Sequence, residues 1–270
     1  MVANPPALWG VLNVTPDSFS DGGDFVSVDV AIERAHQMIA EGAAVIDVGA
    51  ESTRPGAHRI ETDEEISRLA PVAKELISTG VRVSVDTMRA ETARAMVELG
   101  VPIINDVSGG LADPQMFDVI SHSDVDYALM HWRGHSDQMD SLATYDDVVA
   151  EVVAELAQRL DAAHVAGIDS SRLWVDPGLG FAKNMEHNWE LCRHIDQIVA
   201  LGYPVLVGAS RKRFLGALLQ EGHHPKDRDG VSVALSVSLA GRGISAFRVH
   251  EPRLHRDALE VWAKSQNAEE

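Results

Sequence analysis

Carboxylate and amide side chains directly follow three of the apolar runs in this sequence. These residues are Asp86, Asn105 and Asp176. Together they offer several hydrogen-bond acceptors and an amide donor. Such a set suits a flat nitrogen heterocycle with an aminopyrimidinone edge, because that edge presents several donors in one plane. We therefore expect a planar ligand if the chain folds so that the three residues meet.

Basic side chains gather after the last two apolar runs. Arg211 and Lys212 follow one run, and Arg248 and His250 end the other. The Arg fork and the Lys point charge suit an anionic group, above all a phosphorylated one. Basic residues at a helix start oppose the helix dipole, and a bound anion is one reason to place them there.

The elements that carry these residues are short apolar runs separated by segments of helical period. Most runs are continuous in hydrophobic residues, which is typical of strands buried on both faces of a parallel sheet. Polar or charged residues end every run. The runs are Leu8–Leu12, Ala44–Val48, Val81–Val85, Val101–Ile104, Tyr127–Met130, Leu173–Val175, Val205–Val207 and Ala246–Val249.

Two architectures fit eight strands alternating with helices: a doubly wound open sheet and a closed barrel. The first run is not followed by a G-x-G-x-x-G turn, which disfavours an open dinucleotide-binding sheet. A barrel of this kind needs about 250 residues, and the chain has 270. We predict one (β/α)8 TIM-barrel domain over residues 1–270, with the active site at the C-terminal ends of the strands.

Two helix boundaries follow from local signals. Thr62 and Glu65 have the spacing of a capping box, and an apolar helical stripe begins at Ile66. Pro252 stands where a first helical residue is expected. The one cysteine, Cys192, lies in a helical segment, and we interpret it as a packing residue rather than a nucleophile.

Charge and composition exclude several classes of function. The chain has 23 basic and 41 acidic residues, a net charge of -18. This balance argues against binding to nucleic acid or to an anionic membrane, because no broad positive field attracts phosphate backbones. A single cysteine indicates a reducing compartment, and no run reaches the roughly 18 apolar residues of a membrane span. We expect a cytoplasmic protein.

Eight motifs together resemble the dihydropteroate synthase family, in that family's order and spacing and over nearly the whole chain. SVDT and RVH are weak alone, whereas the longest motifs are specific. The motifs are NVTPDSFSDGG (13–23), ESTRPG (51–56), SVDT (84–87), NDVSGG (105–110), MHWRG (130–134), DPGLGF (176–181), GASRKRFLG (208–216) and RVH (248–250).

The resemblance implies a transferase that condenses 6-hydroxymethyl-7,8-dihydropterin pyrophosphate with p-aminobenzoate in folate synthesis. It implies that Asp86, Asn105, Asp176 and Lys212 hold the pterin with Met130 against its ring, and that Asp86, Asp176 and Lys212 are catalytic. Asn13 would ligate a Mg²⁺ cofactor near the pyrophosphate, which Arg248 and His250 would also bind. The arylamine site would be shaped by Thr53, Arg54, Pro55, Phe181 and Ser210.

The resemblance also implies a homodimer and a first loop, residues 15–22, that closes over the site. Three departures from the family pattern are Ala50, Ala182 and the Glu251–Pro252 pair, and none replaces an assigned residue. Two other functions stay open at this point. One is a non-catalytic pterin-binding relative, which the complete NVTPDSF and ESTRPG loops disfavour. The other is a pterin-dependent methyltransferase serving a corrinoid partner, which needs neither a pyrophosphate site nor an arylamine loop.

Overall fold

The computed structural model describes residues 4–15, 23–51, 59–135, 138–139 and 141–266, with the backbone alone for 23–27. Within these residues, eight parallel strands form one sheet in the order β6-β5-β4-β3-β2-β1-β8-β7. The strands are β1 (Ala7–Asn13), β2 (Val45–Gly49), β3 (Val83–Asp86), β4 (Ile103–Asp106), β5 (Asp126–Met130), β6 (Leu173–Asp176), β7 (Leu206–Val207) and β8 (Ala246–Val249).

The sheet closes on itself between its two outermost strands. Val175 of β6 forms a parallel bridge with Val205, directly before β7, and its N–H donates to the Pro204 carbonyl at 3.0 Å. Sequential strands are neighbours all the way round, as a barrel requires and a doubly wound sheet does not. The predicted (β/α)8 architecture is confirmed, and the open-sheet alternative is wrong.

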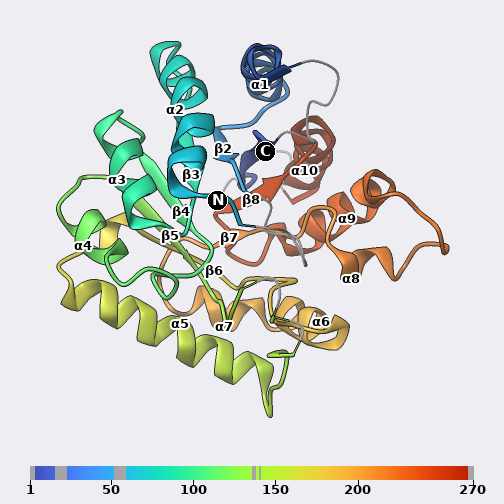
Figure 1. The fold of residues 1–270 in the computed structure, drawn as a ribbon. Coiled ribbons are helices and arrows are strands. Elements are labelled where there is room, and N and C mark those ends of the chain that lie inside the picture. The colour runs from blue at the N-terminus through green and yellow to red at the C-terminus, as the bar shows by residue number, and fades with distance from the viewer. Residues whose placement is uncertain (1–3, 16–22, 52–58, 136–137, 140, 267–270) are drawn as a thin grey trace.

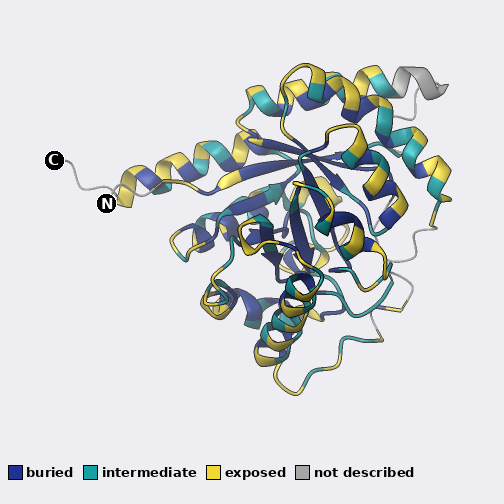
Figure 2. Cartoon of the chain, turned by 90° about the vertical axis from the view of Figure 1, so that its left-hand side faces the viewer, coloured by how far each residue is buried: buried dark blue, intermediate teal, exposed yellow. Residues whose placement is uncertain are grey.

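Helices surround the barrel (Figure 1) and bury one face each (Figure 2). In α2, for example, Leu69, Val72, Ala73 and Leu76 are buried at helical spacing. The helices are α1 (Gly23–Ala40), α2 (Thr62–Ser78), α3 (Ala90–Glu98), α4 (Met116–Ser121), α5 (Val148–Val165), α6 (Met185–Arg193), α7 (Ile195–Val199), α8 (Arg213–Gly216), α9 (Asp229–Ala240) and α10 (Pro252–Gln266), with 3₁₀ turns η2 (Ser170–Arg172) and η3 (Pro225–Arg228).

Both helices begin within one residue of the predicted start, but the predicted capping box is wrong. Pro252 is the first residue of α10, as expected. The capping box at Thr62 does not form: Glu61 is the N-cap residue of α2 and makes no side-chain cap bond. Glu65 is buried instead, and its Oε2 accepts from Arg89 at 2.9 Å and from Thr92 at 2.6 Å. A buried carboxylate must be paired, so the contact with α3 takes priority over the cap.

The barrel interior is filled by an apolar layer at the N-terminal halves of the strands. Trp9 and Trp174 are its largest members, with ring centroids 5.3 Å apart. Val45, Ile103, Ala128, Leu206 and Ala246 complete this buried cluster. Because side chains alternate along a strand, the residues two positions further on also face inward. The next interior layer therefore lies at the carboxyl ends of the strands.

Candidate active site

The second interior layer is polar where the first is apolar. On β2, β4, β5, β6 and β8 it lies two residues beyond the apolar layer, and directly after β7 Gly208 holds the same position. β3 adds Asp86, whereas the matching position on β1 is the apolar Val11. The members from the other strands are Asp47, Asn105, Met130, Asp176 and Arg248. Gly208 leaves space beside two of these side chains, because a Cβ there would lie 3.6 Å from Asp176 Oδ2 and 3.8 Å from Arg248 Cβ. Because side chains alternate along the strands, these residues meet at the C-terminal mouth of the barrel, where they form a layer that we call the polar floor.

Arg248 connects both sides of this floor. Its Nε donates to Asp47 Oδ2, and its Nη2 donates to Asp86 Oδ2 at 2.8 Å. Asn105 Nδ2 donates to Asp47 Oδ2 at 3.2 Å. A cation of β8 thus meets acidic groups of β2 and β3 across one mouth of the barrel. The inner oxygen Asp47 Oδ1 is buried and has no hydrogen-bond partner within the described part of the chain.

Burial shifts the pKa of the ionisable groups on the floor. The pKa of Asp86 rises from 3.8 to about 7, first through burial, against the lowering effect of Arg248. Burial also raises the pKa of Asp176, which the nearby Lys212 opposes. The pKa of Lys212 falls from 10.5 to about 8, again chiefly through burial. The pKa values of Asp86 and Lys212 thus approach one another near neutrality, as is common in active sites.

Lys212 reaches the floor from the loop after β7, where it precedes the four residues of α8. Its Nζ donates to the Leu179 carbonyl and lies 4.3 Å from the centre of the Phe181 ring. Gly180 makes this approach feasible, because a Cβ there would stand 2.7 Å from Lys212 Cδ. The loop after β6 and the lysine after β7 thus hold each other in place.

The remaining predicted residues that the structure describes lie around the same mouth. The Ser210 hydroxyl contacts His250 Nδ1 at 2.9 Å and accepts from the His250 backbone N–H at 3.2 Å. Met130 is buried at the end of β5, opposite Asp176 in register. Asn13 is half-buried at the end of β1, opposite Gly49 in register. Thr53, Arg54, Pro55 and residues 16–22 of the first loop lie outside the described residues.

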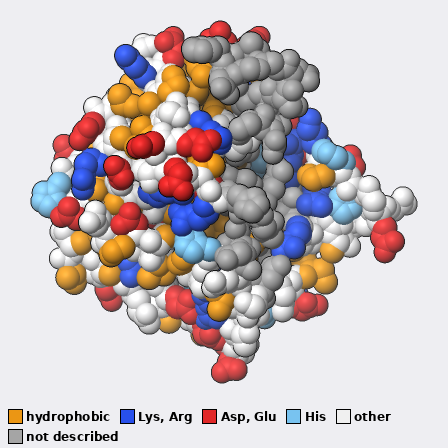
Figure 3. Space-filling view, in the orientation of Figure 1, with side chains coloured by type: hydrophobic (Ala, Val, Ile, Leu, Met, Phe, Trp, Pro, Cys, Tyr) orange, Lys and Arg blue, Asp and Glu red, His pale blue; other side chains and the backbone are white. Residues whose placement is uncertain are grey.

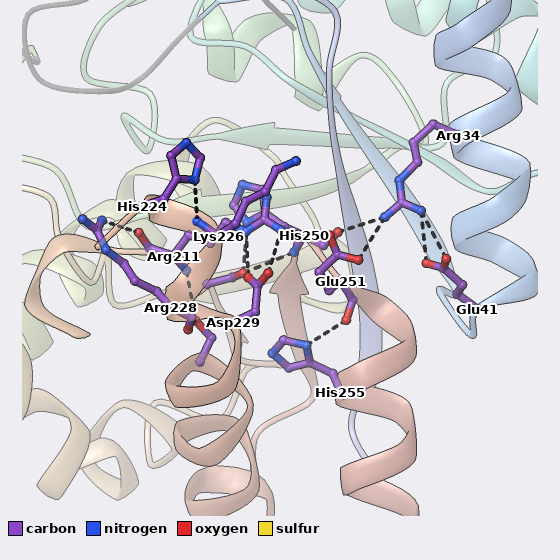
Figure 4. A network of polar contacts seen from close by, with 12 residues as sticks. Arg34, Glu41, Arg211, His224, Lys226, Arg228, Asp229, His250, Glu251 and His255 are labelled. Carbon is purple, nitrogen blue, oxygen red and sulfur yellow. Dashed lines mark hydrogen bonds and ion pairs between the residues drawn. The ribbon is translucent and has the colours of Figure 1, made fainter. Parts of the chain in front are cut away.

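Arg211 does not join the basic group that the sequence predicts. Its backbone has φ 61, and its guanidinium turns to Asp229 on α9, with bonds of 2.7 and 2.8 Å, and to Glu251 at 2.8 Å. Glu251 also pairs with Arg34 of α1 (Figure 4). Lys212 and Arg211 are adjacent in the chain, yet their side chains have separate partners. Figure 3 shows Lys and Arg side chains gathered on the side of α8 and α9.

Two residues of this region were absent from the predicted site. Asp47 stands in the middle of an otherwise apolar strand, VIDVG. A lone acidic residue in a buried strand is the sequence feature that could have identified it. Lys183 is 8% exposed and lies behind the β6 loop.

Other strand-end residues face outward from the barrel interior instead of joining the site. Asp106, for example, accepts from Ser108, Gly110 and the Tyr127 hydroxyl and thereby closes its own loop.

The donor set of the described residues fits Mg²⁺ as an ion shared with a phosphorylated ligand. Among the described residues, no cluster of three or more His, Cys, Asp or Glu side chains has metal-binding geometry. Asn13 is the last residue of β1 and carries an amide oxygen, and Mg²⁺ commonly takes one or two protein oxygens with phosphate and water completing its shell.

Comparison with known proteins decides the family. The model of the family "Pterin binding enzyme" matches residues 9–250. The dihydropteroate synthase of Mycobacterium leprae (strain TN) is 48% identical over 262 residues, which cover 95% of this chain and 92% of that protein. This chain belongs to the dihydropteroate synthase family of pterin-binding enzymes. The resemblance seen in the motifs is thereby confirmed.

Solved structures of this family show the same barrel. The Xanthomonas albilineans dihydropteroate synthase with 4-aminobenzoic acid has a TM-score of 0.92 and 41% identity, covering 99% of this chain and 95% of that chain. The same enzyme in complex with 7,8-dihydropteroate has a TM-score of 0.88 and 38% identity, covering 100% and 97%. Within the described part of this family member, no helix is long and apolar enough to cross a membrane.

Proposed function

We propose that this chain condenses 6-hydroxymethyl-7,8-dihydropterin pyrophosphate with p-aminobenzoate, yielding 7,8-dihydropteroate and pyrophosphate. One observation carries the proposal: Asp86, Asn105 and Asp176 share a barrel mouth with Arg248 and Lys212. The names of the relatives, and the aminobenzoate and dihydropteroate held by the Xanthomonas albilineans enzyme, support the same reaction.

The floor suits the pterin edge because it combines acceptors with donors. The carboxylates of Asp86 and Asp176 would accept from the ring N–H groups, and Asn105 and Lys212 would donate to its oxygen and nitrogen atoms. Asp176 is preorganised for this, since its Oδ1 already accepts from the Gly178 N–H at 2.7 Å. Met130 adds an apolar, polarisable side chain beside Asp176 in register.

During the proposed reaction, the site must stabilise two opposite charges. Departure of pyrophosphate leaves negative charge on the leaving group and positive charge on the exocyclic methylene carbon of the pterin. Arg248 and His250 would offset the first charge, and Asp86 and Asp176 the second. Mg²⁺, held through Asn13 and the substrate phosphates, would add electrostatic stabilisation of the leaving group when bound.

The arylamine nitrogen would then attack the methylene carbon and afterwards lose a proton, so no covalent bond to the protein is required. The state of Cys192 supports a route without a thiol nucleophile. The side chain is buried in α6, and burial raises the pKa of its thiol to about 12. Phe181 and Ser210, with Thr53, Arg54 and Pro55, would shape the arylamine site.

Purified protein given both substrates and Mg²⁺ should release pyrophosphate and form dihydropteroate in equal amounts. EDTA should abolish the release and added Mg²⁺ should restore it. Pterin binding without turnover would favour the non-catalytic relative. Methyl transfer from a methylated pterin to a corrinoid protein would favour the methyltransferase. Arg248 and His250 disfavour the latter, because a methyl donor needs no pyrophosphate site.

We infer further that residues 1–270 form one domain, that the chain forms a homodimer and that it works in the cytoplasm without nucleic-acid or membrane partners. The net charge of -18 supports the absence of polyanionic partners. Sedimentation equilibrium should give twice the monomer mass of 29.2 kDa.

A further inference from the structure

Lys183 is a buried lysine that the proposed reaction leaves without a task. Its Nζ contacts three acceptors: the Gly178 carbonyl at 3.1 Å, the Phe181 carbonyl at 3.0 Å and His131 Nδ1 at 2.8 Å. An ammonium group has three donors, so this set of acceptors satisfies it completely. The lysine therefore ties two carbonyls of the β6 loop to a side chain that follows β5.

His131 is the middle member of a continuous chain of contacts. It is 2% exposed, and its Nε2 lies 2.9 Å from Glu155 Oε2 on α5. Burial lowers the pKa of His131 to about 4, so the ring is neutral at pH 7. Nδ1 then accepts from Lys183 and Nε2 donates to Glu155, whose pKa falls to about 2 through its bonds with His131 and Arg133 against the effect of burial. One tautomer satisfies every contact.

The loop held by Lys183 carries the parts of the site that touch Lys212. Lys212 Nζ donates to the Leu179 carbonyl and lies over the Phe181 ring. Asp176 precedes the loop and is anchored to it through the Gly178 N–H. A displacement of residues 177–182 would therefore move Phe181 and the Lys212 ammonium together.

We propose that Lys183, His131 and Glu155 form a positioning triad that sets the β6 loop, and through it Phe181 and Lys212, for the condensation. The inference rests on the proposed function, because it assigns the loop a reaction to serve. Among the described residues, Lys183 hydrogen-bonds no side chain assigned to a substrate; it acts through the two carbonyls.

A lysine at this place also needs its charge balanced, which explains why the triad ends in a carboxylate. Burial is the largest effect on the pKa of Lys183 and keeps it well below 10.5. The nearby cations Lys212 and Arg133 also lower this pKa, whereas the anions Asp176 and Glu155 raise it. Glu155 supplies an anion on the side away from the mouth, so Asp176 need not serve as the only counter-ion of two lysines. The neutral imidazole of His131 lies between the Lys183 ammonium and the Glu155 carboxylate and hydrogen-bonds both, so it adds no charge of its own.

The test compares Lys183→Met with Lys74→Met, a matched change at an exposed position of α2. Amide hydrogen exchange of the folded proteins and steady-state kinetics are measured on both. We expect exchange at the Gly180 and Phe181 amides to rise at least about 10-fold in Lys183→Met, with the loop at 106–112 unchanged. We expect kcat to fall by about 10- to 100-fold, because small misplacement of reacting groups lowers rates on that scale. Lys74→Met should match the wild type in both.

Two histidine variants separate positioning from general destabilisation. His131→Gln keeps an acceptor for Lys183 and a donor for Glu155, and should recover kcat to within about 5-fold of wild type, since both hydrogen bonds remain available. His131→Leu keeps the bulk and loses both bonds, and should resemble Lys183→Met. If Lys183→Met does not fold, Glu155→Gln serves, with a smaller rise in exchange at the same two amides.

An unchanged exchange rate at Gly180 and Phe181, or equal losses in His131→Gln and His131→Leu, would overturn the proposal. Exchange is measured without turnover, so failure of the proposed function is recognised separately. If the wild-type protein forms no dihydropteroate but Lys183→Met still shows faster exchange at the Gly180 and Phe181 amides, the proposed triad is supported and the proposed reaction is contradicted.

Discussion

Arg248 and Asp86 are joined by an ion pair of 2.8 Å between strands that are not neighbours in the sheet. β8 and β3 are separated by β1 and β2, so the pair crosses the mouth of the barrel rather than running along its wall. Asp47 on β2 binds the same guanidinium. Three charged groups on the floor thus have one shared geometry before any substrate arrives, and such preorganisation is what electrostatic catalysis needs.

Replacing Asp86 by Asn should lower kcat/KM by at least about 10²-fold, because it removes a preorganised anion facing the developing cation. The same change should raise the melting temperature at pH 8. Since the folded pKa of Asp86 lies near 7 and the unfolded value is 3.8, folding takes up a proton between these values. Stability contributed by this group therefore falls as the pH rises through that window. The gain in melting temperature should shrink as the pH falls toward 3.8. A lower melting temperature of the Asn variant at pH 8 would contradict this account.

Lys212→Ala should also lower kcat/KM by at least about 10²-fold. The wild-type rate should show a narrow bell-shaped dependence on pH. Below about 7 the Asp86 carboxylate becomes protonated, and above about 8 the Lys212 ammonium becomes neutral, so kcat/KM falls on both sides. In Lys212→Arg the alkaline limb should move up or vanish while the acid limb stays, because guanidinium does not titrate in this range. An alkaline limb that is unchanged in this variant would assign it to another group.

Much of the fold and part of the site followed from the sequence because strand alternation is a short-range property. Asp86, Asn105, Asp176 and Arg248 stand at strand ends with inward parity, and the barrel brings them together. The outward turn of Arg211 was not predictable in this way. It depends on φ 61 and on partners 18 and 40 residues further along the chain. Lys183 escaped notice because its acceptors are mostly backbone carbonyls, which no side-chain motif reveals.

The departures from the family pattern now have local explanations. Ala182 has φ 45, a left-handed backbone that glycine adopts with less strain, and its carbonyl accepts from the Tyr145 hydroxyl at 2.9 Å. Glu251 pairs with Arg34 and Arg211, and Pro252 begins α10. Ala50 is fully buried and its carbonyl accepts from Arg68 at 3.3 Å. Glu251 thus helps to hold Arg211 away from the predicted basic group, whereas the contacts of Ala50 and Ala182 involve no residue assigned to the site.

Gly178→Ala should destabilise the protein far more than Gly202→Ala. Both glycines have a left-handed backbone, φ 65 and φ 85, so an alanine is strained at either position by about 1–2 kcal/mol. At Gly202 a Cβ would meet nothing within 4 Å, whereas at Gly178 it would stand 2.3 Å from the His131 carbonyl oxygen. Urea unfolding should give a difference of at least about 2 kcal/mol between the two variants. Equal values would mean that the β6 loop moves away from His131 at little cost.

Arg211→Met should reduce stability while leaving the reaction nearly intact, in contrast to changes at the adjacent Lys212. Its guanidinium makes paired bonds to Asp229 and a further bond to Glu251, and its side chain is 17% exposed. Removing it leaves Asp229 partly buried without this partner, so unfolding free energy should fall by about 1–3 kcal/mol, between exposed and buried pairs. Asp229→Asn is the matched change on the acidic side and should lose a similar amount. In pyrophosphate-release assays below the melting temperature, KM for the pterin pyrophosphate should stay within about 3-fold of wild type, well short of the loss expected for an electrostatic group of the site. A 10-fold or larger increase would return Arg211 to the anion site that its place in the sequence suggested.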